Sequence, residues 1–240
     1  MTPSESIKAD RIDPSGARYP LGLLTSYRHP PEIDTLGNLD LLSRPGLGIC
    51  GSRSASAAAL KHAREFGALC AEYGFVVVSG YARGVDREAH KGALLSGGAT
   101  IAVLAEGISN FRLLREFDGI ADYKDNFLAI SVFPSDAHWT VWNADGRNRA
   151  IVGLSQGLFV IEAKERGGTL RAGEECLRQG KPLWVIDYAA RKQKPEGNKL
   201  LLARAAKAIR TKRDLRGVLT SANDSSQPAA RQLSLGNERV

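Results

Sequence analysis

Residues 76–90 have the sequence VVVSGYARGVDREAH, and this stretch decides the fold. A run of β-branched residues ends at Ser79-Gly80, and a short turn with Arg83 and Gly84 leads into an amphipathic segment. The pattern predicts a buried strand followed by a helix N-terminus, where free backbone N–H groups and the helix dipole favour anions. The arginine adds a planar cation that suits phosphate. On this stretch alone, a tight turn and a phosphate site are equally good explanations.

The same alternation continues along the chain. Apolar runs predict strands at 47–50, 75–78, 100–104, 127–132, 158–161 and 183–186, and helical spacing predicts helices at 55–73, 86–95, 148–154 and 170–179. Strands separated by helices in this way predict a mostly parallel, doubly wound sheet. With helices on both faces of the sheet, the expected fold is a three-layer α/β fold.

The other segments flank this α/β core. We predict four parts: an N-terminal lead-in and docking segment (1–43), an α/β domain (44–190), a basic helical segment (191–216) and a disordered tail (217–240). Residues 1–20 are polar and contain three prolines, so we expect them to be flexible. Residues 36–42 are expected to dock on the body, and 198–210 have the spacing of one helix.

The positive charge of the chain is concentrated in one segment. The chain has 33 Lys and Arg against 26 Asp and Glu, a net charge of +7. Residues 191–216 hold ten basic and two acidic residues, so the rest of the chain is close to neutral. This segment is either a solvated tail or an electrostatic handle for nucleic acid. Any affinity of the body for anions must therefore come from a focused site.

Membrane, metal and disulfide functions have no support in the sequence. No apolar run approaches the roughly 20 residues of a membrane span, and the N-terminus lacks a signal-peptide pattern. Cys50, Cys70 and Cys176 are scattered, and neither they nor the four histidines have metal-ligand spacing. We predict a protein of the reducing cytoplasm with no metal, no cofactor and no membrane partner.

Small, hydroxyl and arginine residues follow several predicted strands at their carboxyl ends. Gly51-Ser52-Arg53 follows the strand at 47–50, residues 79–84 follow the next strand, and 162–169 follow the strand at 158–161. In a parallel sheet these ends meet at one edge, where ligands bind. The opposite edge has plain helix caps such as Gly97-Gly98. The sequence therefore predicts an anion-binding edge.

Arg147 and Arg149 flank Asn148 at the expected start of the helix 148–154. Cations at a helix N-terminus oppose the helix dipole, so helix propensity does not explain them. Either both join the anion-binding edge, or one of them forms a structural salt bridge with a carboxylate such as Asp86 or Glu162.

Catalytic patterns do not occur in the sequence. There is no nucleophile-elbow serine, no GxxxxGK[ST] loop and no GxGxxG fingerprint. Asp86 and His90 share a helix face, and a structural hydrogen bond explains them better than acid–base chemistry. Trp139 and Trp142 lie in an expected loop, where they either stack on bases or anchor the loop to the core. We predict no catalytic residue.

Taken together, these motifs resemble one family. Four motifs follow the order and spacing of the DNA-processing protein A (DprA, also called Smf) family: Gly51-Ser52-Arg53, Ser79-Gly80-x-Ala82-Arg83-Gly84-Val85-Asp86, Arg147-Asn148-Arg149 and Gly168-Thr169-Leu170. The resemblance covers roughly residues 44–188. Residues 110–125 replace a usual tyrosine–proline stretch, Ala144-Asp145-Gly146 replaces a Phe-Pro, and no winged-helix end is evident after residue 190. The chain therefore resembles a divergent or minimal member.

The resemblance implies an extended Rossmann-like domain at 44–190 that binds single-stranded DNA and is not an enzyme. It also implies a role in DNA processing, recombination or protection of incoming DNA during natural transformation, a RecA-type recombinase as partner, and dimerisation through this domain. The residues that the edge pattern and the resemblance assign to nucleic acid are Gly51, Ser52, Arg53, Ser79, Gly80, Arg83, Gly84, Arg147, Asn148, Arg149, Gly168 and Thr169.

The alternative is a protein that binds or hydrolyses one nucleotide. Gly167-Gly168-Thr169 followed by Glu174 and Glu175 faintly resembles the glycine turn of phosphoribohydrolases, whose superfamily also includes nucleotide-signal sensors. Glu162, Glu174 or Glu175 would then act as the acid–base group. The surplus of arginines favours a polyanion over a single nucleotide.

Overall fold

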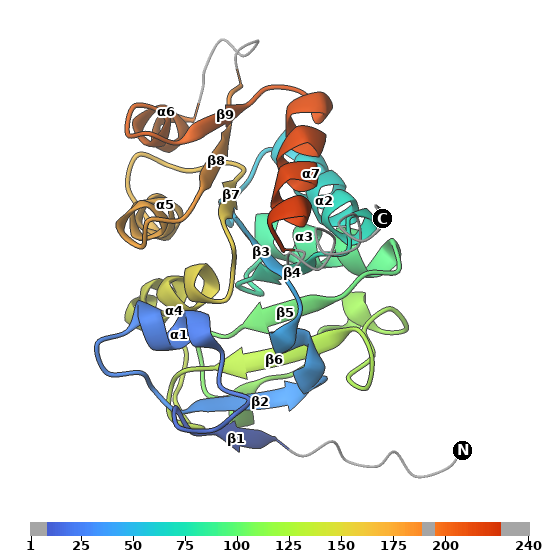
Figure 1. Cartoon of the computed structure of the whole chain (residues 1–240), viewed down its shortest axis with the longest axis vertical. Helices are drawn as coiled ribbons and strands as arrows, with labels where there is room; N and C mark the ends of the chain where they lie inside the picture. Colours follow the sequence, from blue (N-terminus) through green and yellow to red (C-terminus); the bar gives the residue numbers. More distant parts are fainter. Residues whose placement is uncertain (1–8, 189–194, 227–240) are drawn as a thin grey trace, which may run out of the picture.

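Nine strands form one sheet in the order β1-β2-β6-β5-β4-β3-β7-β8-β9 in the computed structural model, which describes residues 9–188 and 195–226 (Figure 1). The strands are β1 (Asp10–Ile12), β2 (Ile33–Gly37), β3 (Gly46–Cys50), β4 (Val76–Ser79), β5 (Thr100–Val103), β6 (Phe127–Ser131), β7 (Leu158–Val160), β8 (Leu183–Ile186) and β9 (Lys207–Ile209).

The sheet is wound in two directions from its centre. β3 pairs in parallel with β4 on one side and with β7 on the other. Parallel pairing then continues outward through β5 and β6 on the first side and through β8 and β9 on the second. Of the nine strands, β1 and β2 pair antiparallel beyond β6. The prediction of a doubly wound, mostly parallel sheet is confirmed.

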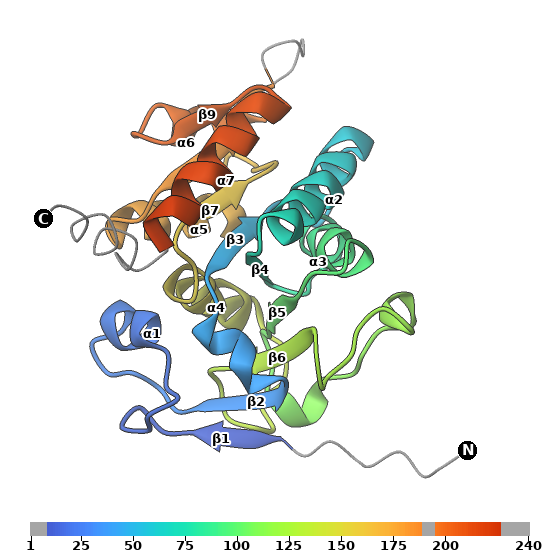
Figure 2. The same cartoon turned by 45° about the vertical axis from the view of Figure 1, so that its right-hand side comes forward.

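Helices cover both faces of the sheet (Figures 1 and 2). One layer holds α1 (Leu21–Ser26), α4 (Val141–Gly153), α5 (Gly168–Arg178) and α6 (Glu196–Leu202). The other layer holds α2 (Ala57–Glu72), α3 (Val85–Leu95) and α7 (Lys212–Ser226). Among the helices of residues 9–188 and 195–226 there is no candidate for a membrane-spanning segment.

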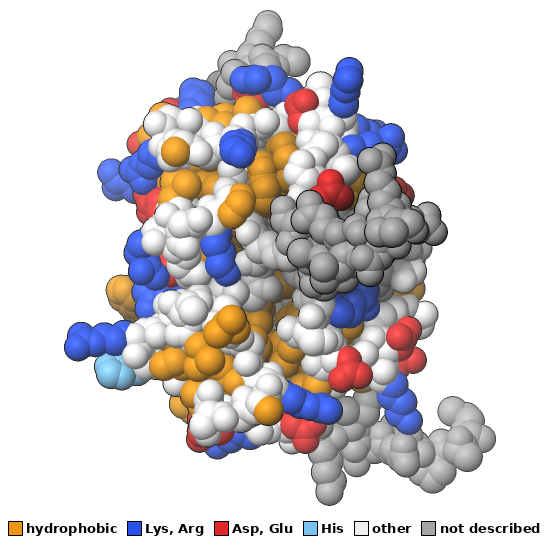
Figure 3. Space-filling view, in the orientation of Figure 1, with side chains coloured by type: hydrophobic (Ala, Val, Ile, Leu, Met, Phe, Trp, Pro, Cys, Tyr) orange, Lys and Arg blue, Asp and Glu red, His pale blue; other side chains and the backbone are white. Residues whose placement is uncertain are grey.

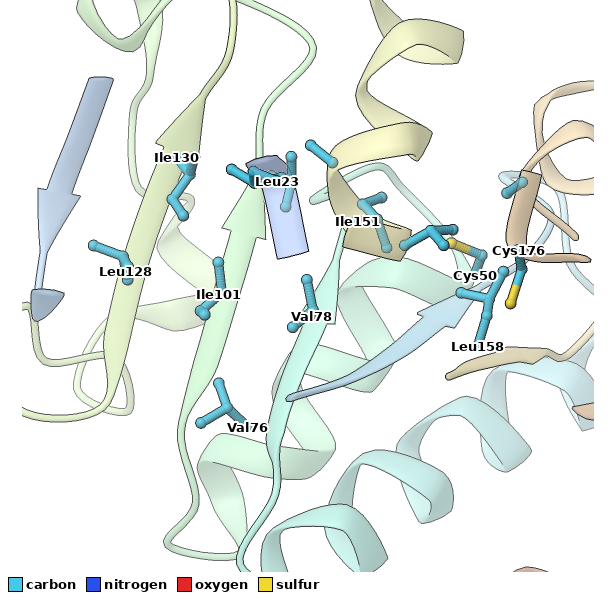
Figure 4. Packing of buried hydrophobic residues seen from close by; sticks show 14 of the residues in the cluster. Leu23, Cys50, Val76, Val78, Ile101, Leu128, Ile130, Ile151, Leu158 and Cys176 are labelled. Atoms are coloured by element: carbon cyan, nitrogen blue, oxygen red, sulfur yellow. The ribbon is translucent and has the colours of Figure 1, made fainter. Parts of the chain in front are cut away.

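The valine run at the start of the deciding stretch shows how the core is built. Side chains alternate between the two faces of a strand, and here both faces are covered. Val76 and Val78 enter the layer that contains Ile151 of α4 (Figure 4), and Val77 enters the opposite layer with Phe66 of α2. All three valines are fully buried. The predicted three-layer arrangement is thus present.

The expectation that residues 1–20 are a flexible lead-in is wrong for its described part. β1 extends the sheet beside β2, and the Arg11 guanidinium donates to the Asp34 carboxylate at 2.7 Å. These strands are short and polar, so their pairing and not an apolar pattern defines them. The segment 36–42 ends β2 and forms the 3₁₀ helix η1 (Leu39–Ser43), in which Leu41 is buried. Residues 1–8 lie outside the described residues.

The C-terminal expectations also need correction. The single helix predicted at 198–210 is the short helix α6 followed by β9, which adds the last parallel strand to the sheet. Residues from 217 onward are predicted to be disordered, but 217–226 are part of helix α7. Leu215 and Leu219 anchor this helix in the layer of α2. Residues 191–194 and 227–240 lie outside the described residues. Whether 44–190 forms a separate domain stays a prediction.

Candidate nucleic-acid interface

Two clefts adjoin each other at the carboxyl edge of the parallel strands. The first, which we call the switch-point cleft, encloses about 380 Å³ between the loops that follow β3 (50–54) and β7 (166–171), with part of α4 as a wall. The chain winds in opposite directions from β3 and β7, and such a topological switch point is where open α/β sheets bind ligands. The location of the cleft follows directly from the strand order.

The switch-point cleft is predominantly cationic. Arg53, Lys164, Arg166 and Arg171 line it with exposed side chains. Of these, Arg171 pairs with Asp145 at 2.5 Å. Gly168 and Thr169 begin α5 at the same cleft. The N-cap residue Gly167 has no side chain to accept hydrogen bonds from the first N–H groups of the helix, so these groups can bind an anion.

The second cleft, which we call the loop cleft, encloses about 390 Å³ on the other side of Arg53. Arg83, Arg87 and Arg112 line it together with the ring of Trp139. Arg87 pairs with Glu116 at 3.3 Å, whereas neither Arg53 nor Arg83 forms an ion pair with any other residue in the described ranges. Arg53 lines both clefts and therefore links them into one basic surface.

The turn that contains Arg83 is held by an aromatic cluster. Tyr81 has a left-handed backbone with φ of 59°, a conformation that costs a non-glycine residue about 1–3 kcal/mol. Its ring stacks on Phe117 at 5.3 Å between centroids and packs edge-on against Phe111. Its hydroxyl accepts a hydrogen bond from the Leu114 backbone N–H at 2.9 Å. Segment 110–125, where the sequence departs from the family pattern, thus holds this turn in place.

Arg147 lines both clefts, but its side chain is buried and held by partners within the protein. Its contact with nucleic acid stays a prediction. Its side chain donates to the Val103 carbonyl at 2.9 Å and pairs with the Asp86 carboxylate at 3.3 Å. The alternative, a structural salt bridge for one arginine, is confirmed. Gly80 makes room for it, because a Cβ at this position would lie 2.1 Å from the Arg147 guanidinium. Burial raises the pKa of Asp86, although Arg147 opposes the shift.

The start of α4 explains why Arg147 does not lie at a helix N-terminus, as the sequence pattern predicts. The helix was predicted to begin at 148, but Thr140 caps it by accepting the Asn143 N–H at 3.0 Å, and α4 runs from Val141. Arg147 therefore lies in mid-helix. Trp142, expected in a loop, lies in the first helical turn.

Asn148 and Arg149 have structural partners as well. The Asn148 amide donates to the Gly168 carbonyl at 3.0 Å and so ties α4 to the start of α5. Arg149 is not among the residues that line either cleft; it pairs with Glu175 at 3.3 Å and lies 5.4 Å from the Tyr27 ring centroid. Its contact with nucleic acid stays a prediction.

Some of the predicted serine and glycine residues line a cleft, and others have a structural role. Ser79 is fully buried and donates to the Ile49 carbonyl at 2.6 Å, so it joins β4 to β3 and does not line either cleft. Ser52 lines the switch-point cleft beside Gly51, and its hydroxyl accepts the Ser54 N–H at 3.1 Å. Gly84 has φ of 92°, and a Cβ there would lie 2.4 Å from the Ser52 carbonyl oxygen. Its role is to let the two turns pack closely.

His90 is a structural group, as expected, but its partner is not Asp86. Its Nδ1 lies 2.5 Å from the Thr100 hydroxyl, which itself donates to the Val77 carbonyl at 2.8 Å. Nδ1 must therefore carry the proton that this hydroxyl accepts. Complete burial, with help from Arg147, lowers the pKa of His90 to about 3.

We expect His90 to make the protein less stable in mild acid. The unfolded chain binds a proton at His90 below about pH 6.5, while the folded chain resists it down to about pH 3. Stability is therefore lost as the pH falls through this window, by about 1.4 kcal/mol per pH unit from this group. Urea unfolding at about pH 7 and pH 5 should show a loss about 2 kcal/mol smaller in His90→Gln than in the wild type. Parallel pH profiles for the two proteins would contradict this assignment.

Several cleft residues were not identified from the sequence. Lys164 and Arg166 lie in the segment 162–169 that is predicted to reach the edge, although they are not among the predicted contacts, and Arg171 lies in the first turn of α5. Arg112 lies in a segment without an interpretable motif, and only the folded chain brings it to the loop cleft.

The described part of the basic C-terminal segment, residues 195–216, lines neither cleft. Four of its cations pair locally: Lys199 with Glu196, Arg204 with Glu174, Arg210 with Asp187 and Lys212 with Glu65. On the face shown in Figure 3, basic side chains are scattered mainly along the margins, and apolar side chains gather over α1. These pairs reduce the charge that the segment can offer to a distant ligand.

The carboxylates proposed for nucleotide hydrolysis have other partners. Glu162 accepts hydrogen bonds from the backbone and hydroxyl of Ser56 at the start of α2. Glu174 pairs with Arg204, and Glu175 pairs with Arg178 at 2.5 Å. None of the three lines the switch-point cleft. Within the two described ranges, no group of three His, Cys, Asp or Glu side chains could hold a metal ion.

The fold and the clefts define a class: a Rossmann-like, doubly wound α/β protein with a cationic cleft at its switch point. Within this class the chain belongs to the DNA recombination-mediator protein A family, whose model matches residues 11–220. The resemblance noted in the motifs is thereby confirmed.

Known relatives agree in sequence and in fold. The DNA processing protein DprA of Streptococcus pneumoniae is 32% identical over 198 residues, covering 82% of this chain and 70% of the relative. The X-ray structure of DprA from the same organism superposes with a TM-score of 0.77 at 29% identity, covering 89% of this chain and 74% of that one. A DprA structure from Helicobacter pylori, described for its single-stranded DNA binding mode, has a TM-score of 0.76 at 22% identity and covers 90% of this chain and 98% of that one, a likeness in fold.

Proposed function

We propose that this protein binds single-stranded DNA across the two clefts. The observation that carries the proposal is Arg53, an exposed cation that lines both clefts and has no ion-pair partner among the described residues. An arginine in this position can contact consecutive phosphates of one strand, whereas a single nucleotide would occupy one cleft only. The family to which the chain belongs supports the same ligand.

The size of the clefts favours a single strand over a duplex. Each encloses just under 400 Å³, a volume suited to a group of small-molecule size such as one nucleotide. A flexible strand can place successive nucleotides in two such clefts, and a rigid duplex cannot. Gly51, Ser52, Arg53, Gly80, Arg83, Gly168 and Thr169 remain the proposed contacts from the sequence, to which the structure adds Lys164, Arg166 and Arg112.

The wider role proposed here follows from the family. The protein would act without catalysis in DNA processing, in recombination or in protection of incoming DNA during natural transformation, in the cytoplasm. A RecA-type recombinase and a second copy of the chain are its proposed protein partners. These proposals rest on family membership and not on a particular contact.

The direct test is an oligonucleotide titration at several salt concentrations. We expect an unstructured single strand to bind at least tenfold more tightly than a duplex of the same length. We also expect the logarithm of affinity to fall linearly with the logarithm of salt, because bound cations displace counterions from the strand. Equal affinity for both forms, or binding that ignores salt, would refute the proposal. Release of a base from a nucleoside monophosphate would instead support the hydrolytic alternative.

A further inference from the structure

Large exposed apolar side chains gather beside the two clefts. In the described part of the chain five such residues occur, and three of them lie within four consecutive positions: Trp139 at 46% exposed, Val141 at 61% and Trp142 at 84%. The other two, Leu21 and Leu95, lie on α1 and at the end of α3. Singly exposed apolar residues are common, but a group of them next to a cleft is a candidate interaction site.

Two of the three side chains line the clefts, and Trp142 follows them in the first turn of α4. Trp139 lines the loop cleft, and Val141 lines the switch-point cleft. The Arg53 guanidinium lies 5.2 Å from the Trp139 ring centroid, so cation and ring are arranged as one unit. The Thr140 cap fixes the backbone between them at the start of α4.

Comparison with the third tryptophan excludes a packing role for Trp142. Trp184 is only 7% exposed and stacks on Phe159 at 4.7 Å between ring centroids. Trp142 is almost entirely solvated, although a tryptophan ring gains more than most side chains from burial. Its exposed ring face is available to a ligand that supplies an aromatic surface of its own.

We propose that Trp139 and Trp142 form a stacking platform for the bases of a strand whose phosphates are bound by Arg53 and Arg83. The inference rests on the proposed function and names the residues that select single strands. Unpaired bases expose their faces and stack on aromatic rings whatever their sequence, whereas a duplex hides those faces. Discrimination against duplex would then come from the tryptophans, and salt-dependent affinity from the arginines.

The first experiment uses the intrinsic fluorescence of the full chain, which contains three tryptophans. Titration with oligothymidylate should quench the emission of the two exposed rings and leave that of Trp184 unchanged. Trp142→Phe should keep most of the affinity, because a phenylalanine ring still stacks on a base. The part of the quenching that comes from Trp142 should be absent in this variant. Undiminished quenching in a Trp139→Phe/Trp142→Phe double variant would place the signal at Trp184 and overturn the proposal.

The second experiment separates stacking from charge. Trp142→Leu keeps an apolar side chain but removes the ring, and we expect about 5- to 30-fold weaker binding of oligothymidylate at every salt concentration. The slope of affinity against salt should not change, because no counterion is released by stacking. Leu95→Ala is the matched control, an exposed apolar truncation at the opposite end of the parallel strands, and it should bind as the wild type does.

An abasic oligonucleotide completes the test. The wild type should bind the abasic strand more weakly than oligothymidylate. Trp142→Leu should bind the abasic strand as tightly as the wild type does, because this strand has no base that could stack on Trp142. Wild-type affinity for oligothymidylate in both Trp139→Leu and Trp142→Leu would overturn the platform while leaving the proposed function intact. A chain that binds no single strand at all would instead overturn the proposed function. Equally tight binding of the abasic strand and of oligothymidylate by the wild type would show that the bases do not stack on the tryptophans, and it would overturn the proposal.

Discussion

Replacing Arg147 by alanine is expected to lower the free energy of unfolding by about 3–5 kcal/mol. The guanidinium is buried, donates to the Val103 carbonyl and pairs with the Asp86 carboxylate at 3.3 Å. Its removal leaves a buried carboxylate without its cation and a carbonyl without its donor. Most domains are stable by only about 5–15 kcal/mol, so urea denaturation at neutral pH should show a large shift of the midpoint.

The double variant Arg147→Met/Asp86→Leu is the control. It replaces both charges by apolar groups, and such replacements often cost little, so it should be more stable than Arg147→Ala. The difference between Arg147→Ala and the wild type should also shrink toward about pH 4. Burial already raises the pKa of Asp86, and in the variant this carboxyl would take up a proton in the folded state. A loss below about 1 kcal/mol at neutral pH would show that water solvates the pair.

Replacing Arg53 by alanine should weaken single-stranded DNA binding by about 100-fold without unfolding the protein. This side chain is exposed, lines both clefts and lies over the Trp139 ring, so its loss removes a charge-assisted phosphate contact and a support of the ring. Because one cation no longer displaces counterions, the slope of affinity against salt should fall by about one. Fluorescence or anisotropy titration at several salt concentrations measures both quantities.

Arg44→Ala is the matched control for this variant. Arg44 and Arg53 are both exposed and flank the same strand, β3, but at opposite ends. Loss of Arg44 changes the net charge equally, so its effect measures non-specific attraction alone. Equal losses in the two variants would show that net charge and not the edge of the sheet binds the strand.

The central fold could be predicted because each core strand carries its own apolar signal. Val76–Val78 must be buried on both faces, and the parallel, helix-covered sheet follows from that requirement. The edges of the sheet carry no such signal. β1 and β9 have three residues each and depend on partners distant in sequence, so no local pattern distinguishes them from loops.

The position of the site could be predicted, but the direction of its side chains could not in every case. Turns after parallel strands must meet at one edge, and this rule placed Arg53 and Arg83 correctly. Ser79 is still within β4, where alternation turns it into the core. Arg147 and Arg149 are two positions apart on a helix, so they cannot share a face. That constraint was available from the sequence once the start of α4 was known.

The strained backbone of Tyr81 makes the turn at the loop cleft dependent on segment 110–125. Phe117 supports that residue without lining either cleft, so a substitution there can shift the backbone from Gly80 to Gly84 while every cationic side chain is retained. The strength of anion binding therefore depends also on a supporting layer that contacts no ligand.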